Sequence, residues 1–279
     1  MEPRERSYIN VDVEDFFGDI SIDMDRGLQS SASLVPDRRH NSGNVLDAFC
    51  TRLEELSRER YDEVLEDCVL EKKSTDSDKP IWAEADAASK IYILCSGAAY
   101  SFTILPNGRR YISDVFGPGA ICNWSRLGVG ELPCDILLKA ATGYVAIRPD
   151  RLAEAFRTNP RLHNAVLRFQ HARALRCSQR TRTLVVGQST DRFMHFLLDL
   201  RDEFGRRHLE PEGSTMVETP LSQREIADLL GITPVHLSRT IQALASQERL
   251  SRDGRFFQIR DTPAEVERLE YKRFFSRRG

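Results

Sequence analysis

The stretch LSQREIADLLGITPVHLSRTIQ constrains the fold of this chain more than any other part of the sequence. Ser222, followed three residues later by Glu225, forms a capping box that begins a helix. Gly231 can then adopt the positive φ of a tight turn, and Thr233 and Pro234 suit the N-cap and first position of a second helix. Two capped helices joined at a glycine predict a helix-turn-helix, the arrangement that places its second helix in the major groove of DNA.

The second helix of this motif has one apolar and one polar face. Its apolar positions are expected to be buried: Leu237, Ile241 and Leu244. Its outward positions are the candidates for contacts with base edges: Val235, His236, Ser238 and Arg239. Beyond the helix, RLSRDGRFFQIRD predicts a strand, an Asp-Gly turn and a second strand, which together form the wing of a winged helix. The side chains expected to contact DNA phosphates are Ser222, Arg224, Thr233, Arg252 and Arg255.

Charge is distributed unevenly, although the net charge of the 279 residues is only −2. Residues 1–80 hold 11 Lys and Arg against 20 Asp and Glu, whereas the remaining residues hold 29 against 22. A nucleic-acid binder needs local positive charge rather than a basic total, and the C-terminal excess permits that function. The sequence contains neither a membrane-length apolar run nor an apolar leader, so we expect a cytoplasmic protein without a membrane partner.

The first half of the chain changes character twice. Residues 1–43 are acidic, polar and weakly periodic, which predicts a disordered tail. Residues 44–66 predict a single helix, with Asn44 as its N-cap. The apolar face of that helix consists of Leu46, Phe49, Leu53 and Leu56. From about residue 68 to 148, short β-rich runs alternate with turn signals such as LPNGRR, so a β-sandwich or barrel is expected there.

A long helix is predicted from Pro160 onward, within NPRLHNAVLRFQHARALRCSQRTRTL. One face carries a narrow apolar seam made of Leu162, Ala165, Phe169 and Ala172. The other face carries the arginines Arg161, Arg168, Arg173 and Arg176. A narrow seam on a long helix favours pairing with the same helix of a second chain, because soluble oligomers are mostly symmetric dimers. The alternative is that the seam packs on the β domain of its own chain.

Six cysteines are spread along the sequence: Cys50, Cys68, Cys95, Cys122, Cys134 and Cys177. None belongs to a C-x-x-C pair or a tight cluster, which argues against a structural zinc site and a sequence-local iron–sulfur cluster. We expect most of them to be buried thiols. Cys177 is the candidate for redox chemistry, because three neighbouring arginines, Arg173, Arg176 and Arg180, are expected to favour its thiolate. An inert thiol is the alternative.

Enzymatic function is not favoured by the sequence. We find no His/Glu/His metal set, no nucleophile elbow and no Gly-rich phosphate loop, so we predict no catalytic residue and no metal ligand. A third class, a DNA-binding structural or antagonist protein that never contacts RNA polymerase, stays open.

The order of helix, β strands, long helix, helix and winged helix-turn-helix resembles the Crp/Fnr family of bacterial transcription regulators. The resemblance covers about residues 64–261 and rests on PIWAEADAASKIYILCSG, NPRLHNAVLRFQHAR and QREIADLLGITPVHLSRTIQAL. It implies an α+β fold with a helix and a jelly-roll-like, cyclic-nucleotide-binding-like β-roll sensor domain over 44–159. It further implies a dimerisation helix over 160–184 and a winged helix-turn-helix DNA-binding domain over 185–279.

The family resemblance also implies a function and assigns roles to residues. The expected protein is a homodimer that binds a two-fold symmetric site in double-stranded DNA, responds to a signal sensed in or near the β-roll, and has RNA polymerase as a further partner. Arg239 falls where family members contact a guanine, through O6 and N7. Val235 departs from the family's usual glutamate, and Pro234 replaces an arginine of the cyclic-AMP receptor branch. We therefore expect a half-site related to, but different from, that of the cyclic-AMP receptor.

The residues do not identify the signal. GVGELPC contains the Gly-Glu-Leu of the family's cyclic-nucleotide cassette, but no arginine follows where that cassette has one, so we do not expect a cyclic nucleotide. Haem binding would use His163, His171 or Cys177 on the long helix as axial ligands and is a minor alternative. Oxidation of Cys177 is another alternative. A protein with no ligand, controlled by its abundance or by a protein partner, is the last.

Overall fold

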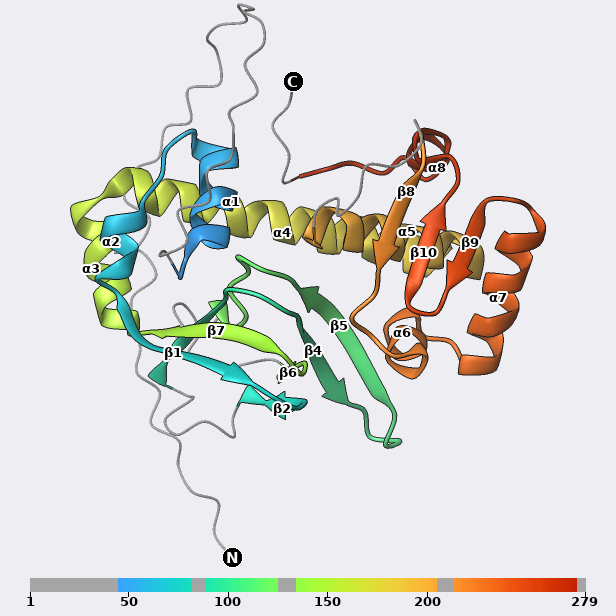
Figure 1. Cartoon of the computed structure of the whole chain (residues 1–279), viewed down its shortest axis with the longest axis horizontal. Coiled ribbons are helices and arrows are strands. Elements are labelled where there is room, and N and C mark those ends of the chain that lie inside the picture. The colour runs from blue at the N-terminus through green and yellow to red at the C-terminus, as the bar shows by residue number, and fades with distance from the viewer. Residues whose placement is uncertain (1–44, 82–88, 125–133, 205–212, 275–279) are drawn as a thin grey trace, which may run out of the picture. The chain divides into compact units, whose positions relative to one another are not determined.

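The computed structural model describes residues 45–81, 89–124, 134–204 and 213–274 (Figure 1). The predicted acidic tail, residues 1–43, lies outside these ranges, and so does almost all of GVGELPC. The helices are α1 (Asp47–Ser57), α2 (Asp62–Glu66), α3 (Pro149–Thr158), α4 (Pro160–Val186), α5 (Ser189–Phe204), α6 (Gln223–Leu230), α7 (Pro234–Ser246) and α8 (Thr262–Arg268). The strands are β1 (Val69–Thr75), β2 (Lys79–Pro80), β3 (Ile91–Leu94), β4 (Ala99–Ile104), β5 (Arg110–Phe116), β6 (Asp135–Leu138), β7 (Thr142–Ile147), β8 (Thr215–Glu218), β9 (Leu250–Asp253) and β10 (Phe256–Ile259).

The predicted helix over 44–66 is in fact two helices. Arg58, with φ of 66°, ends α1 in the left-handed region, and α2 starts four residues later. Leu46 is the N-cap of α1, while Asn44 lies outside the described residues. The predicted apolar face is nevertheless correct at its centre, because Phe49 and Leu53 are buried.

The β-roll consists of two antiparallel sheets, ordered β1-β7-β3 and β2-β6-β4-β5. Side chains alternate across each sheet because successive residues of a strand point to opposite faces. In β3, Ile91 and Ile93 pack with the helices, whereas Tyr92 and Leu94 pack with side chains of the other sheet. The predicted LPNGRR hairpin is confirmed, and Gly108 takes a φ of 76° in its turn.

The apolar seam of α4 packs on its own chain rather than on a partner. Leu162, Ala165, Phe169 and Ala172 are all buried, in a core shared with α1, α2, α3 and strands β3 and β7. Figure 1 shows α1, α2 and α3 gathered around the N-terminal half of α4. The prediction that these four side chains form the dimer interface is therefore wrong, because residues covered by their own core cannot reach a second chain. Helical periodicity identified the buried face but not the surface that covers it.

The C-terminal part is a winged helix-turn-helix. A small sheet ordered β8-β10-β9 carries the wing. Phe193 and Leu197 of α5, Leu237 of α7 and Phe257 of β10 share one buried core. Among the helices of the described ranges, none is long and apolar enough to cross a membrane.

Candidate nucleic-acid interface

Local capping positions the two helices of the helix-turn-helix. The Ser222 hydroxyl accepts from the Glu225 amide at 3.3 Å, and the Glu225 carboxylate accepts from the Ser222 amide at 2.7 Å, which confirms the capping box. Gly231 ends α6 with a φ of 68°. The hydroxyl of Thr233 accepts from the His236 amide at 3.2 Å and caps α7. All of these signals are local in sequence, which explains why sequence reasoning found them.

The recognition helix α7 exposes three of its four predicted base-reading residues. Val235 is 63% exposed, and His236 and Arg239 are also exposed on the surface. Leu237 and Leu244 on the opposite face are buried, as predicted. The polar face of α7 is therefore free to enter a groove.

Ser238 differs from the other three base-reading candidates because its hydroxyl already has protein partners. It donates to the Pro234 carbonyl at 3.0 Å and accepts from the Gln223 side-chain amide at 2.7 Å. Its side chain is partly buried between α6 and α7. Sequence reasoning missed Gln223, because nothing local to that residue indicates a bond to a residue fifteen positions away.

The start of α6 and the wing converge on a single depression. A cavity of about 250 Å³ is lined by Ser222, Gln223, Arg252, Gly254 and Arg255, among others. Three of the predicted phosphate-contacting residues thus lie together. Within the wing, Arg252 Nε donates to the Gly254 carbonyl at 2.9 Å and Arg255 pairs with Glu218 at 2.9 Å. The other two candidates are also exposed: Arg224 lies on α6, and Thr233 is the N-cap of α7.

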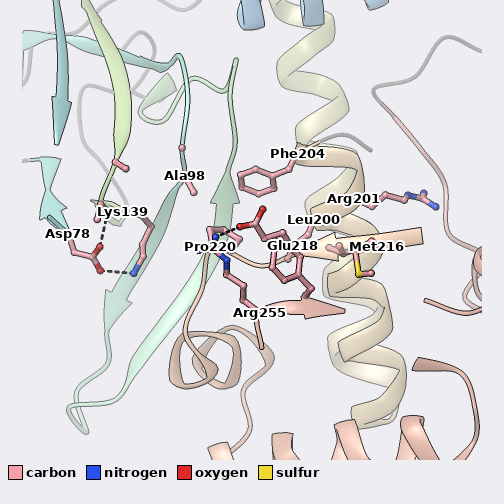
Figure 2. Close-up of a pocket in the computed structure, with 15 residues that line it drawn as sticks. Asp78, Ala98, Lys139, Leu200, Arg201, Phe204, Met216, Glu218, Pro220 and Arg255 are labelled. Atoms are coloured by element: carbon pink, nitrogen blue, oxygen red, sulfur yellow. Dashed lines mark hydrogen bonds and ion pairs between the residues drawn. The ribbon is translucent and has the colours of Figure 1, made fainter. Parts of the chain in front are cut away.

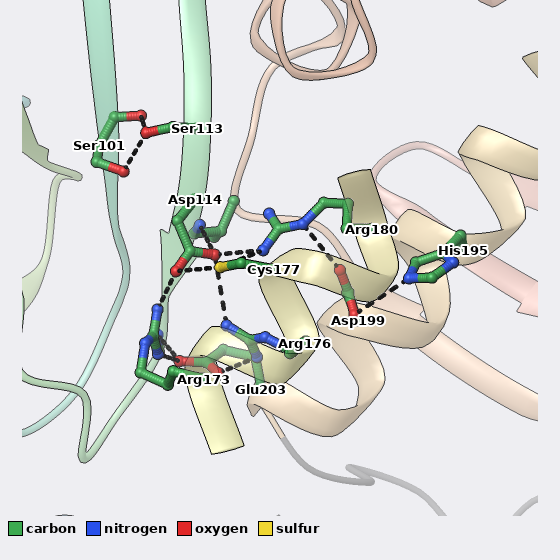
Figure 3. Close-up of polar contacts among 12 residues, drawn as sticks. Ser101, Ser113, Asp114, Arg173, Arg176, Cys177, Arg180, His195, Asp199 and Glu203 are labelled. Carbon is green, nitrogen blue, oxygen red and sulfur yellow. Dashed lines mark hydrogen bonds and ion pairs between the residues drawn. The ribbon is translucent and has the colours of Figure 1, made fainter. Parts of the chain in front are cut away.

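A buried charge network fills the junction between α4, α5 and β5 (Figure 3). Asp114 of β5 pairs with Arg173, Arg176 and Arg180 of α4. Glu203 of α5 pairs with Arg173, Arg176 and Arg52, and accepts from the Gly117 amide at 2.8 Å. The remaining cavity among these groups measures about 10 Å³, which leaves room for one water at most.

The arginines on the second face of α4 have two environments. Arg161 and Arg168 are exposed, whereas Arg173 and Arg176 are buried in this network. Burial opposes ionisation of Glu203, but attraction by Arg176, Arg52 and Arg173 outweighs it and holds the pKa of this carboxyl well below its usual range. Sequence reasoning missed Asp114 and Glu203, because the sequence shows the arginines beside the apolar seam but not which of them are buried and therefore need a carboxylate partner.

The prediction of an activated thiolate at Cys177 is wrong. Burial and the nearby Asp114 carboxylate raise the pKa of the Cys177 thiol above its ordinary value, and together they outweigh the arginines. The three arginines form ion pairs with the carboxylates of Asp114, Glu203 and Asp199. The Cys177 sulfur lies 3.8 Å from Asp114 Oδ2, in the donor position of a weak hydrogen bond.

The histidines named as haem ligands have ordinary surroundings. The His163 ring stacks on Phe156 with centroids 4.9 Å apart, and burial lowers its pKa. His171 is exposed on α4. Across the described ranges, no three His, Cys, Asp or Glu side chains gather in a way that could hold a metal ion.

Comparison with known proteins agrees with this geometry. Residues 191–264 match the family model of the Crp-like helix-turn-helix domain. The transcriptional activator protein FnrA of Stutzerimonas stutzeri is 22% identical over 201 residues, which cover 72% of this chain and 81% of FnrA. The nitrogen fixation regulation protein FixK of Azorhizobium caulinodans is 25% identical over 61% of this chain and 67% of FixK.

Solved structures share the fold. FixK2 from Bradyrhizobium japonicum superposes with a TM-score of 0.55 at 23% identity, covering 71% of this chain and 96% of FixK2. A cyclic nucleotide-binding domain containing protein from Listeria monocytogenes superposes with a TM-score of 0.61 at 18% identity, covering 79% of this chain and 99% of that protein. Residues 191–264 therefore carry a Crp-like helix-turn-helix domain, and over most of its length the chain is similar to transcription regulators of the Crp/Fnr type.

Proposed function

We propose that this regulator binds a two-fold symmetric DNA site as a homodimer, with α7 in the major groove of each half-site. The observation that carries the proposal is the shared exposure of Val235, His236 and Arg239 on one face of α7. The phosphate-contacting candidates Ser222, Arg252 and Arg255 line one depression between the start of α6 and the wing. Arg239 contacts a guanine, and Val235 contacts an apolar edge such as a thymine methyl. Residues 185–279 are the DNA-binding domain in this proposal, and 44–159 the sensor domain.

The proposed dimer forms through the exposed face of α4, within the dimerisation segment 160–184 and just beyond it. That face presents Leu175, which is 41% exposed, and Val185, which is 73% exposed. His171 precedes Leu175 on this face, and Ser178 lies between Leu175 and Val185. Positions 171, 175, 178 and 185 are spaced by four, three and seven residues, which is the spacing of a heptad seam in a helix pair. Two-fold symmetry then places the recognition helices one DNA turn apart, about 34–36 Å.

RNA polymerase is the proposed protein partner on promoter DNA, since the similar protein FnrA is named a transcriptional activator. Regulation of transcription by this chain takes place in the cytoplasm in this proposal. Control through the β-roll is part of the proposal, and its signal is left open. The junction of α4 with β5 is filled by the buried charges, which favours a signal acting elsewhere on the domain over a ligand inserted there.

Selection of duplexes from a random pool by the purified full-length chain tests the proposal. The expected outcome is a palindromic consensus with guanine in each half-site, bound by a dimer in sedimentation analysis. Recovery of unrelated duplexes, bound with a steep salt dependence and no shared motif, contradicts sequence-specific recognition. Transcription by purified RNA polymerase from a promoter carrying the selected site then decides between activation and repression.

A further inference from the structure

Two carboxylates of α6 face the β-roll instead of solvent. Glu225 is only 5% exposed, and Asp228 lies one turn later on the same helix. The capping box uses Glu225 Oε2, which accepts from the Ser222 amide. Glu225 Oε1 is left for a second partner, and the β-roll supplies it.

Tyr100 and Lys139 of the β-roll both bind Glu225. The Tyr100 hydroxyl donates to Glu225 Oε1 at 3.0 Å, and Lys139 Nζ donates to the same oxygen at 3.0 Å. Lys139 is held in place by Asp78, at 2.6 Å. Burial opposes the charge of Lys139, but its bonds to Asp78 and Glu225 raise the pKa overall, so this lysine remains an ammonium.

Arg110 of β5 joins the second carboxylate to the first. Its Nε donates to Asp228 Oδ2 at 2.9 Å, and its Nη1 donates to the Tyr100 hydroxyl at 2.7 Å. A continuous chain of hydrogen bonds therefore runs from Asp228 through Arg110 and Tyr100 to Glu225. Hydrogen bonds to charged groups are among the stronger hydrogen bonds in proteins.

The packing beside these bonds is incomplete (Figure 2). A cavity of about 340 Å³ lies between the roll and the winged part, and Asp78, Ala98 and Lys139 line one side of it. Leu200, Phe204, Glu218, Pro220 and Arg255 line the other side. Beside this cavity, Tyr100, Phe102, Ile112 and Val115 of the roll share one buried apolar core with α5 and α6. The interface therefore combines an apolar core with polar contacts at its incompletely packed margin.

We propose that Tyr100, Arg110 and Lys139 form a latch that holds α6 on the β-roll, and that the latched arrangement is the one that binds DNA. The base-reading face of α7 stays exposed while the latch is closed. The two cations also compensate Glu225 and Asp228, which otherwise repel phosphates approaching Ser222 and Arg224. A signal that shifts the β4–β5 hairpin reaches α6 directly through these bonds. The direction of the DNA effect rests on the proposed function, whereas the latch itself does not.

Two neighbouring arginines of one hairpin provide the test. Arg110 belongs to the latch, whereas Arg109 is exposed and lies outside it, so Arg109→Gln is a matched control for Arg110→Gln. We expect Arg110→Gln to speed hydrogen exchange of the α6 amides and to weaken binding of the selected palindrome about tenfold. Arg109→Gln should change neither. Tyr100→Phe, which removes only a hydroxyl, should speed α6 exchange in the same direction.

A charge swap separates the latch from a direct DNA contact. Arg110→Asp combined with Asp228→Arg should restore slow exchange and DNA affinity if the two side chains act on each other; failure of this rescue in both measurements overturns the latch. Unchanged α6 exchange in Arg110→Gln also overturns it, with or without DNA. Faster exchange with equal or tighter binding of the palindrome overturns the claim that the latched form binds DNA. If the wild-type chain selects no DNA motif, the proposed function fails while the exchange data still decide the latch.

Discussion

The Gln223 side-chain amide donates to Oγ of Ser238 at 2.7 Å, and this bond joins the first residue of α6 to the recognition helix α7. Ser238 in turn donates to the Pro234 carbonyl one turn earlier. The hydroxyl is therefore held between two helices whose relative angle sets where α7 enters the groove. Its main contribution is to the geometry of the motif.

Removing either partner of this bond should destabilise the fold by a similar, modest amount. We expect Gln223→Ala and Ser238→Ala each to lower the free energy of unfolding by about 0.5–1.5 kcal/mol. Because both variants delete the same hydrogen bond, the double variant should lose less unfolding free energy than the sum of the two single losses. Urea unfolding of the four proteins measures this coupling, and strict additivity contradicts a direct bond. Gln242→Ala, at an exposed position of α7, is the control.

Arg239 and Arg224 should fail in different ways when truncated. Arg239→Ala is expected to weaken binding to the selected site by about 1–3 kcal/mol, while binding to random duplexes stays nearly unchanged. Arg224→Ala removes a phosphate contact, so it should weaken both duplexes alike and lower the salt slope by about one. Fluorescence anisotropy across a salt series separates the two patterns. Equal loss on both duplexes for Arg239→Ala rules out base reading by that side chain.

The motif was predictable because its determinants are local. Ser222, Glu225 and Gly231 lie within ten residues, and each has a backbone role that its residue type alone suggests. The alternation of short β-rich runs and turn signals likewise predicted a β-sandwich or barrel, and two antiparallel sheets lie there. Periodicity on α4 showed which face is apolar, but the cover for that face comes from α1 and α3, which no local signal identifies.

The buried charge network could not be predicted from local sequence either, because its partners are far apart in the chain. Asp114 lies 59 residues from Arg173, and Glu203 lies 30 residues beyond that arginine. An arginine beside an apolar seam can either face solvent or pair with a buried carboxylate, and the tertiary fold decides which of the two occurs. The latch residues Tyr100 and Arg110 have the same character, since their partners on α6 are more than a hundred residues away.

Opposite faces of α4 should respond differently to substitution. Leu175→Asp places a carboxylate on the proposed dimer face, and like charges meeting across two-fold symmetry should weaken the dimer by several kcal/mol, or more than about a hundredfold. Phe169→Ala empties a fully buried site and should lower the free energy of unfolding by about 3–5 kcal/mol. Sedimentation velocity and urea unfolding give the two readouts. A Leu175→Asp protein that stays dimeric at low concentration contradicts the proposed face.

Cys177 should behave as an unreactive thiol. Its raised pKa keeps it protonated at neutral pH, so iodoacetamide should label it more slowly than a free thiol in a short peptide. Mild peroxide treatment should change DNA binding of the wild type no more than it changes DNA binding of Cys177→Ser. Mass spectrometry of tryptic peptides follows the labelling. Rapid modification of Cys177 in the folded chain contradicts this account and revives a redox role.

Glu203 should make the fold sensitive to acid. Its pKa in the folded chain is well below the ordinary value of 4.5, since Arg176, Arg52 and Arg173 surround it. A depressed folded pKa contributes stability that is complete above the unfolded pKa and is lost as pH falls through it towards the folded pKa. Unfolding free energy should therefore be constant with respect to this group from pH 7 to about 5 and should decline below about 4.5.

Glu203→Gln tests that assignment. At pH 7 the substitution leaves buried arginines without one carboxylate and should cost about 3–5 kcal/mol. Between pH 5 and pH 3 the variant should lose less stability than the wild type, because the titrating group is gone, although Asp114 still titrates. Asp135→Asn, at an exposed position of β6, is the surface control. Urea unfolding at pH 7, 5, 4 and 3 supplies the comparison, and parallel acid losses in Glu203→Gln and the wild type contradict a role for Glu203 in acid sensitivity.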